Sequence, residues 1–172
     1  MCVKCLAEKG KQIQFKEKKQ KLKKQKANTP AKLKKKLWTL VSLFVRQSAA
    51  DHRGMAACYT CGAVDEWKYM DAGHAIGGRT GAVLFDLEIL RIQCKACNGP
   101  RGRGNYQMFT AKLIEEHGHD WWYAKLAAAK QIRKWTRPEL NQMIEEFTQK
   151  LSVLERAKKW TTTDQTNEQE SA

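Results

Sequence analysis

Residues 58–62 read Cys58-Tyr-Thr-Cys61-Gly62, and residues 94–98 read Cys94-Lys-Ala-Cys97-Asn98. A Cys-x-x-Cys turn presents two thiolates with the spacing that a tetrahedral zinc ion requires. Four independent buried cysteines are the alternative interpretation, but two such pairs in one chain favour a metal. We therefore predict a structural zinc site with four sulfur ligands. Such a site has no open coordination position, so it stabilises the fold and does no chemistry.

The charge of the chain is concentrated at its start. The protein has 172 residues, enough for one domain with extensions, and a formal net charge of +14. Residues 1–36 contain 14 lysines and 2 glutamates, which leaves the remainder nearly neutral. A lysine-rich arm on a balanced domain indicates a polyanion partner, here DNA, with Lys32 and Lys35 among the candidate contacts. A solvated arm that only aids solubility is the alternative.

The sequence predicts a cytoplasmic location, and this location affects how the cysteine pairs are interpreted. The start of the chain is charged and has no apolar core, so we expect no signal peptide. The longest apolar run, residues 37–45, is too short to cross a bilayer, so we expect a cytoplasmic protein without membrane contact. Thiols stay reduced there, which favours metal binding over disulfides. Cys2 and Cys5 offer only two ligands: they are a remnant half-finger, meet a second copy in a dimer, or are inert.

The sequence predicts helices on both sides of a central segment that is not helical. Thr29 and Pro30 have the form of a helix start, and Thr136 to Glu139 has the form of a capping box. Asp120 is a candidate N-cap. The helices that we expect span residues 30–47, 106–117, 121–133 and 139–158. Between the first two, residues 56–98 are rich in glycine, cysteine and aromatic residues, with short strands such as residues 67–70 and a glycine-marked loop over residues 73–81.

Three polar residues lie close to the cysteine pairs in sequence. Asp71-Ala-Gly-His74 stands between the pairs, and Asn98 directly follows Cys97. Phosphodiester cleavage needs a base and a cation, and His74 can be the base while Asp71 and Asn98 offer hard oxygens to Mg²⁺ or Mn²⁺. Alternatively, His74 is an ordinary histidine, Asp71 caps a turn and Asn98 caps the helix after Cys97. The loop arginines, which are phosphate contacts or solvated charges, are Arg79, Arg101 and Arg103.

These motifs carry a resemblance to a known family. From about Leu37 to Lys158 the chain resembles the NinG/Rap recombination proteins of lambda-like phages, which belong to the HNH (ββα-metal) nucleases. The Asp-x-x-His and Cys-x-x-Cys-Asn patterns are also similar to those of endonuclease VII. The resemblance implies that Asp71 and Asn98 bind the catalytic metal and that His74 activates water. It further implies cutting of branched DNA, such as Holliday junctions and D-loops, in the host cytoplasm, with a homodimer and other phage recombination proteins as candidate partners.

The chain departs from the pattern of that family at three places. Ile89 stands where the middle Asn of the HNH motif is usual, so a backbone carbonyl or another side chain must orient His74. Gly99-Pro100 falls where the helix of the metal site should continue, which predicts a very short helix. The family's N-terminal finger has four cysteines, and this chain has only Cys2 and Cys5 there.

We therefore expect an α+β fold with a small zinc-stabilised ββα-metal centre, treble-clef or HNH-like, surrounded by helices. The expected organisation is a basic arm over residues 1–28, the nuclease domain over 29–160 and a disordered tail over 161–172. The function that we predict is a metal-dependent, structure-specific endodeoxyribonuclease. The alternatives are a non-catalytic zinc-containing DNA-binding accessory protein, which Ile89 favours, and an RNA-binding zinc protein.

Overall fold

The computed structural model describes residues 15–19, 29–77 and 81–169, with residues 159–169 as backbone only. The principal elements are α2 (Pro30–Ser48), β1 (Met55–Ala57), β2 (Val64–Glu66), β3 (Asp71–His74), β4 (Leu90–Gln93), α3 (Lys95–Asn98), α4 (Tyr106–His117), α5 (His119–Ala129) and α6 (Arg137–Gln169). Short 3-10 turns occur at η1 (Trp67–Tyr69), η2 (Leu87–Ile89) and η3 (Arg103–Asn105). The mixture of helices and small strands confirms the α+β class. Most of the basic arm, the Cys2/Cys5 pair and Arg79 lie outside the described residues.

Helices α2 and α6 form one layer of the fold. Pro30 is the first residue of α2, as the sequence predicts, and its missing N–H is tolerated because first-turn amides have no helical partner. Leu33, Leu37, Val41 and Val45 are buried at four-residue spacing, which puts them on one face of α2. They pack in one cluster with side chains of α6 such as Leu140. Burial of each such side chain stabilises the fold by about 1.5–3 kcal/mol.

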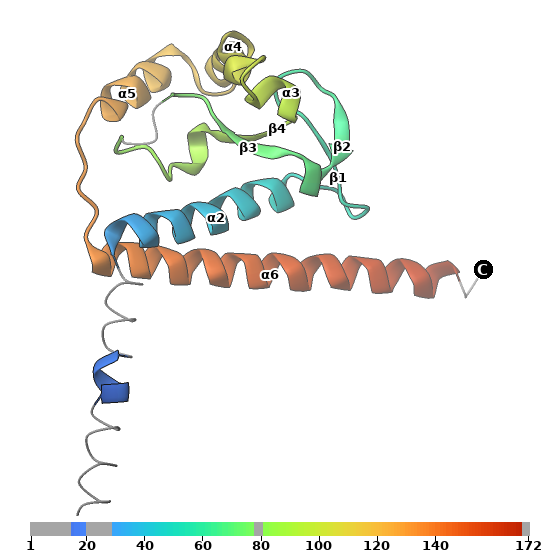
Figure 1. The fold of residues 1–172 in the computed structure, drawn as a ribbon. Helices are drawn as coiled ribbons and strands as arrows, with labels where there is room; N and C mark the ends of the chain where they lie inside the picture. Colours follow the sequence, from blue (N-terminus) through green and yellow to red (C-terminus); the bar gives the residue numbers. More distant parts are fainter. Residues whose placement is uncertain (1–14, 20–28, 78–80, 170–172) are drawn as a thin grey trace, which may run out of the picture.

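The strands form two separate antiparallel pairs, β1 with β2 and β3 with β4. In the second pair Asp71 lies opposite Gln93 and His74 lies opposite Leu90. Figure 1 shows α2 between α6 and the β3–β4 pair, with α4 and α5 on the other side of these strands. Isolated two-stranded pairs are at best marginally stable in water, so the helices and the cysteine cluster must hold them in place.

The central segment differs from the sequence prediction in two places. Residues 67–70 are not a strand: η1 occupies Trp67–Tyr69, and the backbone N–H of Met70 donates to the Trp67 carbonyl at 3.2 Å. Gly73 lies inside β3 and does not mark a loop. A Cβ atom at Gly73 would stand 1.9 Å from Oε1 of Gln93, so this glycine allows a close approach of β3 to that side chain.

The helix boundaries after residue 105 agree with the sequence in part. Helix α4 spans the predicted residues. Helix α5 starts at His119, which places Asp120 in its first turn and not at its N-cap, and it ends at Ala129, before the predicted end at residue 133. The capping box of α6 is confirmed. The Thr136 backbone N–H donates to Oε2 of Glu139 at 2.7 Å, and the Glu139 backbone N–H donates to Oγ1 of Thr136 at 3.4 Å.

Helix α6 is longer than predicted. It continues past the expected end near residue 158 to Gln169, through most of the span expected to be a tail. Near the end of the described side chains, the Lys158 ammonium donates to the carbonyls of Gln47 and Ala50, which lie at the C-terminal end of α2. A cation is stabilising at that end of a helix. None of the described helices is both long enough and apolar enough to span a bilayer.

Candidate metal centre and cleavage site

Four cysteine sulfurs converge at the ends of three elements. Cys58 follows β1, Cys61 lies in the same turn, Cys94 follows β4 and Cys97 lies in α3. All four sulfurs lie within 4.8 Å of one another, and those of Cys61 and Cys94 are 3.8 Å apart. A tetrahedron with Zn–S bonds of about 2.3 Å has sulfur–sulfur edges of about 3.8 Å. The cluster therefore has the donor chemistry and the size of a structural zinc site.

The pKa values of two of these thiols shift in opposite directions. Burial disfavours the Cys58 thiolate, but hydrogen bonds from the Thr60 hydroxyl and from backbone amides outweigh burial and lower its pKa to about 6. The Cys61 thiolate is favoured by a backbone hydrogen bond at Ala63. Partial desolvation of this exposed residue and its hydrogen bonds with the neighbouring thiols nevertheless raise its pKa to about 12. Negative charge thus concentrates on Cys58, and a dication would allow its neighbours to ionise as well.

Gln93 and Thr60 support the cluster, a role that the sequence motifs around them did not indicate. The side chain of Gln93 is fully buried, and its Nε2 donates to Oγ1 of Thr60 at 3.1 Å and to the Gly104 carbonyl at 2.9 Å. Because Thr60 accepts from Gln93, its own hydroxyl hydrogen is left for the Cys58 sulfur, 3.4 Å away. A glutamine directly before Cys94, after the apolar Ile92, was the available signal.

The loop after α3 is tied to the same cluster. Its residues Arg103, Gly104 and Asn105 have φ values of 45°, 80° and 46°, a left-handed backbone that is strained for arginine and costs about 1–3 kcal/mol. The Arg103 backbone N–H donates to the Gly99 carbonyl at 2.9 Å. Nδ2 of Asn105 donates to the Cys97 sulfur at 3.7 Å. These bonds hold the strained backbone in place.

The structure brings Asp71 and Asn98 into direct contact. Asp71 begins β3, and Asn98 is the last residue of α3, which is as short as Gly99 and Pro100 predict. Nδ2 of Asn98 donates to Oδ2 of Asp71 at 3.2 Å. Because Asn98 directly follows Cys97, the cysteine cluster fixes the position of this pair.

A cavity of about 430 Å³ lies beside this pair. It is lined by His74, Gly77, Asn98, Gly99, Pro100, Arg103, Gly104 and Tyr106. Asp71 is not among the lining residues. It lies three positions before His74 in β3, and side chains at that spacing point to opposite faces of a regular strand. Asn98 therefore connects Asp71 to the cavity that His74 and Arg103 line.

Two of the contacts of His74 involve Leu84 and Trp38. Its Nε2 lies 3.1 Å from the Leu84 carbonyl, and its ring stacks on Trp38 of α2 with centroids 4.7 Å apart and planes inclined by 21°. A carbonyl can only accept, so Nε2 carries the hydrogen and the lone pair of the neutral ring is on Nδ1. Ile89, where the middle Asn was expected, is fully buried in the core. The contacts to His74 thus come from a backbone carbonyl and from another side chain, the two kinds of partner that the sequence left open.

The remaining candidates are spread over the surface. Arg101 is exposed in the loop beside Arg103 but is not among the residues that line the cavity. Lys32 and Lys35 are exposed in the first two turns of α2, also away from the cavity lining. Arg101, Lys32 and Lys35 thus lie outside the cavity lining, whereas Arg103 is part of it.

The sequence matches a protein-family model over most of its length. The family is described as "Bacteriophage Lambda NinG protein", and the match covers residues 3–158. The matched span includes the four clustered cysteines as well as Asp71, His74 and Asn98. No curated protein and no solved structure gives a significant match.

Proposed function

Because the chain belongs to the bacteriophage lambda NinG family, we propose that it acts in phage recombination as a metal-dependent endonuclease that cuts branched DNA, such as Holliday junctions and D-loops. One observation carries the proposal. Asn98, which directly follows a cysteine of the metal cluster, is bonded to Asp71 and lines the same cavity as His74. A base and hard oxygen ligands beside one cavity are what hydrolysis of a phosphodiester requires.

Two metals have separate places in this proposal. The four sulfurs of the cysteine cluster suit zinc in a structural role. Asp71 and Asn98 offer a carboxylate and an amide oxygen from two elements that lie in contact, a donor set that suits Mg²⁺ or Mn²⁺. When bound, such an ion would stabilise the negative charge that develops on the scissile phosphate and on the leaving 3′-oxygen.

In this proposal, side chains of the protein activate the water, orient the base and bind the phosphate. Nδ1 of His74 takes a proton from the attacking water, since Nε2 carries the hydrogen in the neutral ring. Trp38 and the Leu84 carbonyl keep the imidazole in one orientation. Arg103 lines the cavity and binds a phosphate oxygen through its guanidinium. This division of roles is similar to that of the ββα-metal nucleases and endonuclease VII.

A non-catalytic accessory protein is the second candidate. The observation in its favour is Ile89, a fully buried apolar residue where the HNH pattern has Asn. In that case the cavity binds the phosphate backbone of DNA and the zinc cluster only supports the fold. The two candidates differ in one property, the cleavage of a bound phosphodiester.

A synthetic Holliday junction distinguishes them. The zinc-loaded protein is incubated with the junction and with a linear duplex of matching sequence, each with and without Mg²⁺. We expect cuts close to the branch point, only with Mg²⁺, and little cutting of the duplex. Junction binding without cleavage in either Mg²⁺ or Mn²⁺ would establish the accessory role instead.

A further inference from the structure

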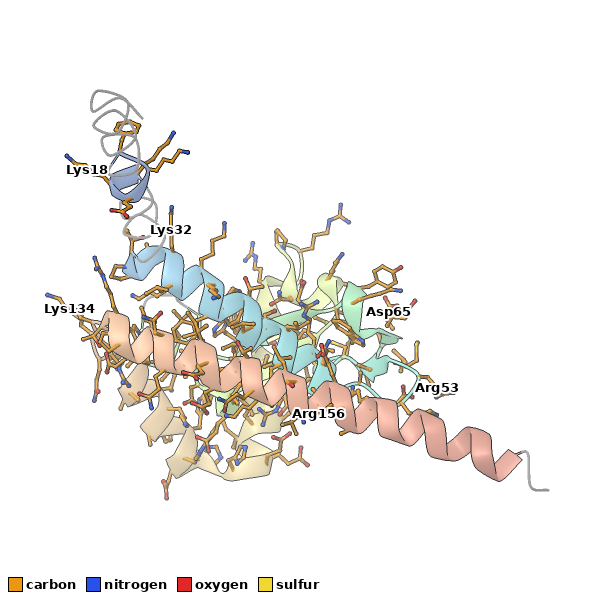
Figure 2. The ribbon with its side chains drawn as sticks, turned by 90° about the horizontal axis from the view of Figure 1, so that it is seen from below. Lys18, Lys32, Arg53, Asp65, Lys134 and Arg156 are labelled. Carbon is orange, nitrogen blue, oxygen red and sulfur yellow. The ribbon has the colours of Figure 1, made fainter. Side chains whose placement is uncertain are left out.

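Two helices begin side by side at one end of the molecule. Figure 1 shows the starts of α2 and α6 next to each other, and Figure 2 shows Lys32 and Lys134 at this same end. The packing of Leu33 and Leu140 in one cluster agrees with this parallel arrangement. The "basic end", as we name it, consists of Lys32, Lys34, Lys35, Lys36, Arg133, Lys134 and Arg137.

Little negative charge opposes these cations. Residues 29–38 and 130–138 contain no acidic residue. The next carboxylate along α6, Glu139, is engaged by Thr136 and lies 3.5 Å from the Arg133 guanidinium. The N-terminal ends of two helices add further positive potential. The basic end is therefore a surface that attracts an extended polyanion.

We propose that the basic end binds the phosphate backbone of duplex DNA next to the cleavage cavity. Its adjacency to a cut site rests on the proposed function, whereas the binding itself does not. Helix α2 connects the two places, because Trp38 stacks on His74 and Lys32 lies six residues earlier, about 9 Å along the helix axis. One helical turn of DNA spans about 34–36 Å. A duplex that enters the cavity can therefore contact both places within one turn.

The aromatic residues at this end favour a duplex over a single strand. Single strands are bound by exposed aromatic rings on which bases stack. Here Trp38 is stacked on His74. The Arg133 guanidinium lies over the Trp135 ring, 3.9 Å from the ring centroid, and Trp135 also makes an edge-to-face contact with Phe85. These rings already have protein partners, and the lysines of the basic end offer contacts to phosphates only.

An anionic membrane is the rival polyanion. Ile132 is 91% exposed in the segment before α6. Peripheral membrane binding generally uses an amphipathic helix with a broad apolar face, whereas residues 132–136 are not helical. This difference favours DNA, and the experiment below includes vesicles.

The test replaces Lys32, Lys36, Lys134 and Arg137 with Gln in the full chain. A matched control replaces Arg53, Lys68, Lys150 and Arg156 with Gln, and Figure 2 shows Arg53 and Arg156 far from Lys32 and Lys134. Binding to a fluorescent duplex is measured without Mg²⁺, so that no cleavage contributes, between about 50 and 200 mM salt. For the basic-end variant we expect the slope of log affinity against log salt to flatten by about 1 per cation and the affinity to fall at least about tenfold. The control should keep the wild-type slope within about 1.

Three outcomes overturn the proposal: a wild-type slope in the basic-end variant, an equal change in the control, or lost binding to phosphatidylserine vesicles with duplex binding intact. The last outcome would assign the surface to a membrane. Because no cutting is measured, failure of the nuclease assignment leaves this result unaffected. Conversely, a protein that cuts junctions but has an unaltered slope in the variant would refute the basic end alone.

Discussion

The imidazole of His74 and the indole of Trp38 lie stacked, 4.7 Å apart between ring centroids. If this contact positions the base, Trp38→Leu should lower junction cleavage by about 10- to 100-fold, since small misplacements of catalytic groups are that costly. Trp38→Phe keeps an aromatic face and should restore most of the rate. Single-turnover cleavage at saturating DNA measures the effect.

Trp135→Leu is the control, because Trp135 is also a partly buried tryptophan at the edge of the same core. Both substitutions should lower the free energy of unfolding, whereas only Trp38→Leu should slow cleavage. Equal rates for the two variants would show that the stack with His74 has no part in positioning.

Zinc content tests the cysteine cluster independently of any activity. Elemental analysis should find one zinc per chain, and Cys94→Ser should lose it and unfold residues 56–105, because a structural zinc contributes folding free energy directly. Cys2→Ser, which leaves the four clustered cysteines unchanged, should keep the zinc. Freshly purified wild-type protein without zinc would contradict the structural site.

Gln93 donates to the Thr60 hydroxyl, which in turn donates to the Cys58 sulfur. The Thr60 hydroxyl should therefore strengthen zinc binding although it is not itself a ligand. Thr60→Val should weaken zinc binding by about 10- to 100-fold, the usual effect of losing a supporting hydrogen bond, while Thr60→Ser should not. Competition with a chelator measures the affinity. Thr39→Val, at an exposed position of α2, is the control, and an equal loss there would remove the support for this role.

The capping box of α6 predicts a dependence of stability on pH. Hydrogen bonds from the Thr136 backbone and hydroxyl hold the pKa of Glu139 below its ordinary value of 4.5. A lowered pKa stabilises the fold above the ordinary value and ceases to do so as the pH falls through the folded-state pKa. Glu139→Gln should therefore unfold at lower urea than wild type near pH 7, and the two midpoints should converge as the pH falls below 4.5. A gap that stays constant with pH would mean that the charge of Glu139 is not involved.

Local sequence signals predicted the parts of the fold that depend on local chemistry. The spacing of Cys58, Cys61, Cys94 and Cys97 indicated one cluster, since each Cys-x-x-Cys turn fixes its own geometry. Pro30 and the pair Thr136–Glu139 marked helix starts through bonds within one turn. The four-residue strands β3 and β4 were missed because so short a segment gives no readable alternation.

The surroundings of the candidate site could not be predicted in the same way. Trp38 and Leu84 reach His74 from α2 and from the segment before η2, and only the packing of the whole core brings them there. The left-handed backbone at Arg103 and Asn105 also depends on tertiary bonds, among them the one from Gln93 to the Gly104 carbonyl. Such contacts join residues far apart in sequence, and their pattern leaves no local signal.

The most direct test of the cleavage site compares His74→Ala with wild type on a Holliday junction in saturating Mg²⁺. We expect cleavage to fall by about 10²–10⁴-fold, the usual contribution of a positioned base, with DNA affinity and zinc content unchanged. His117→Ala, whose ring stacks on Trp121 and is not among the cavity lining, should cut at the wild-type rate. If His74→Ala also cuts at the wild-type rate, His74 is not the base and the assignment of cleavage to this cavity is wrong.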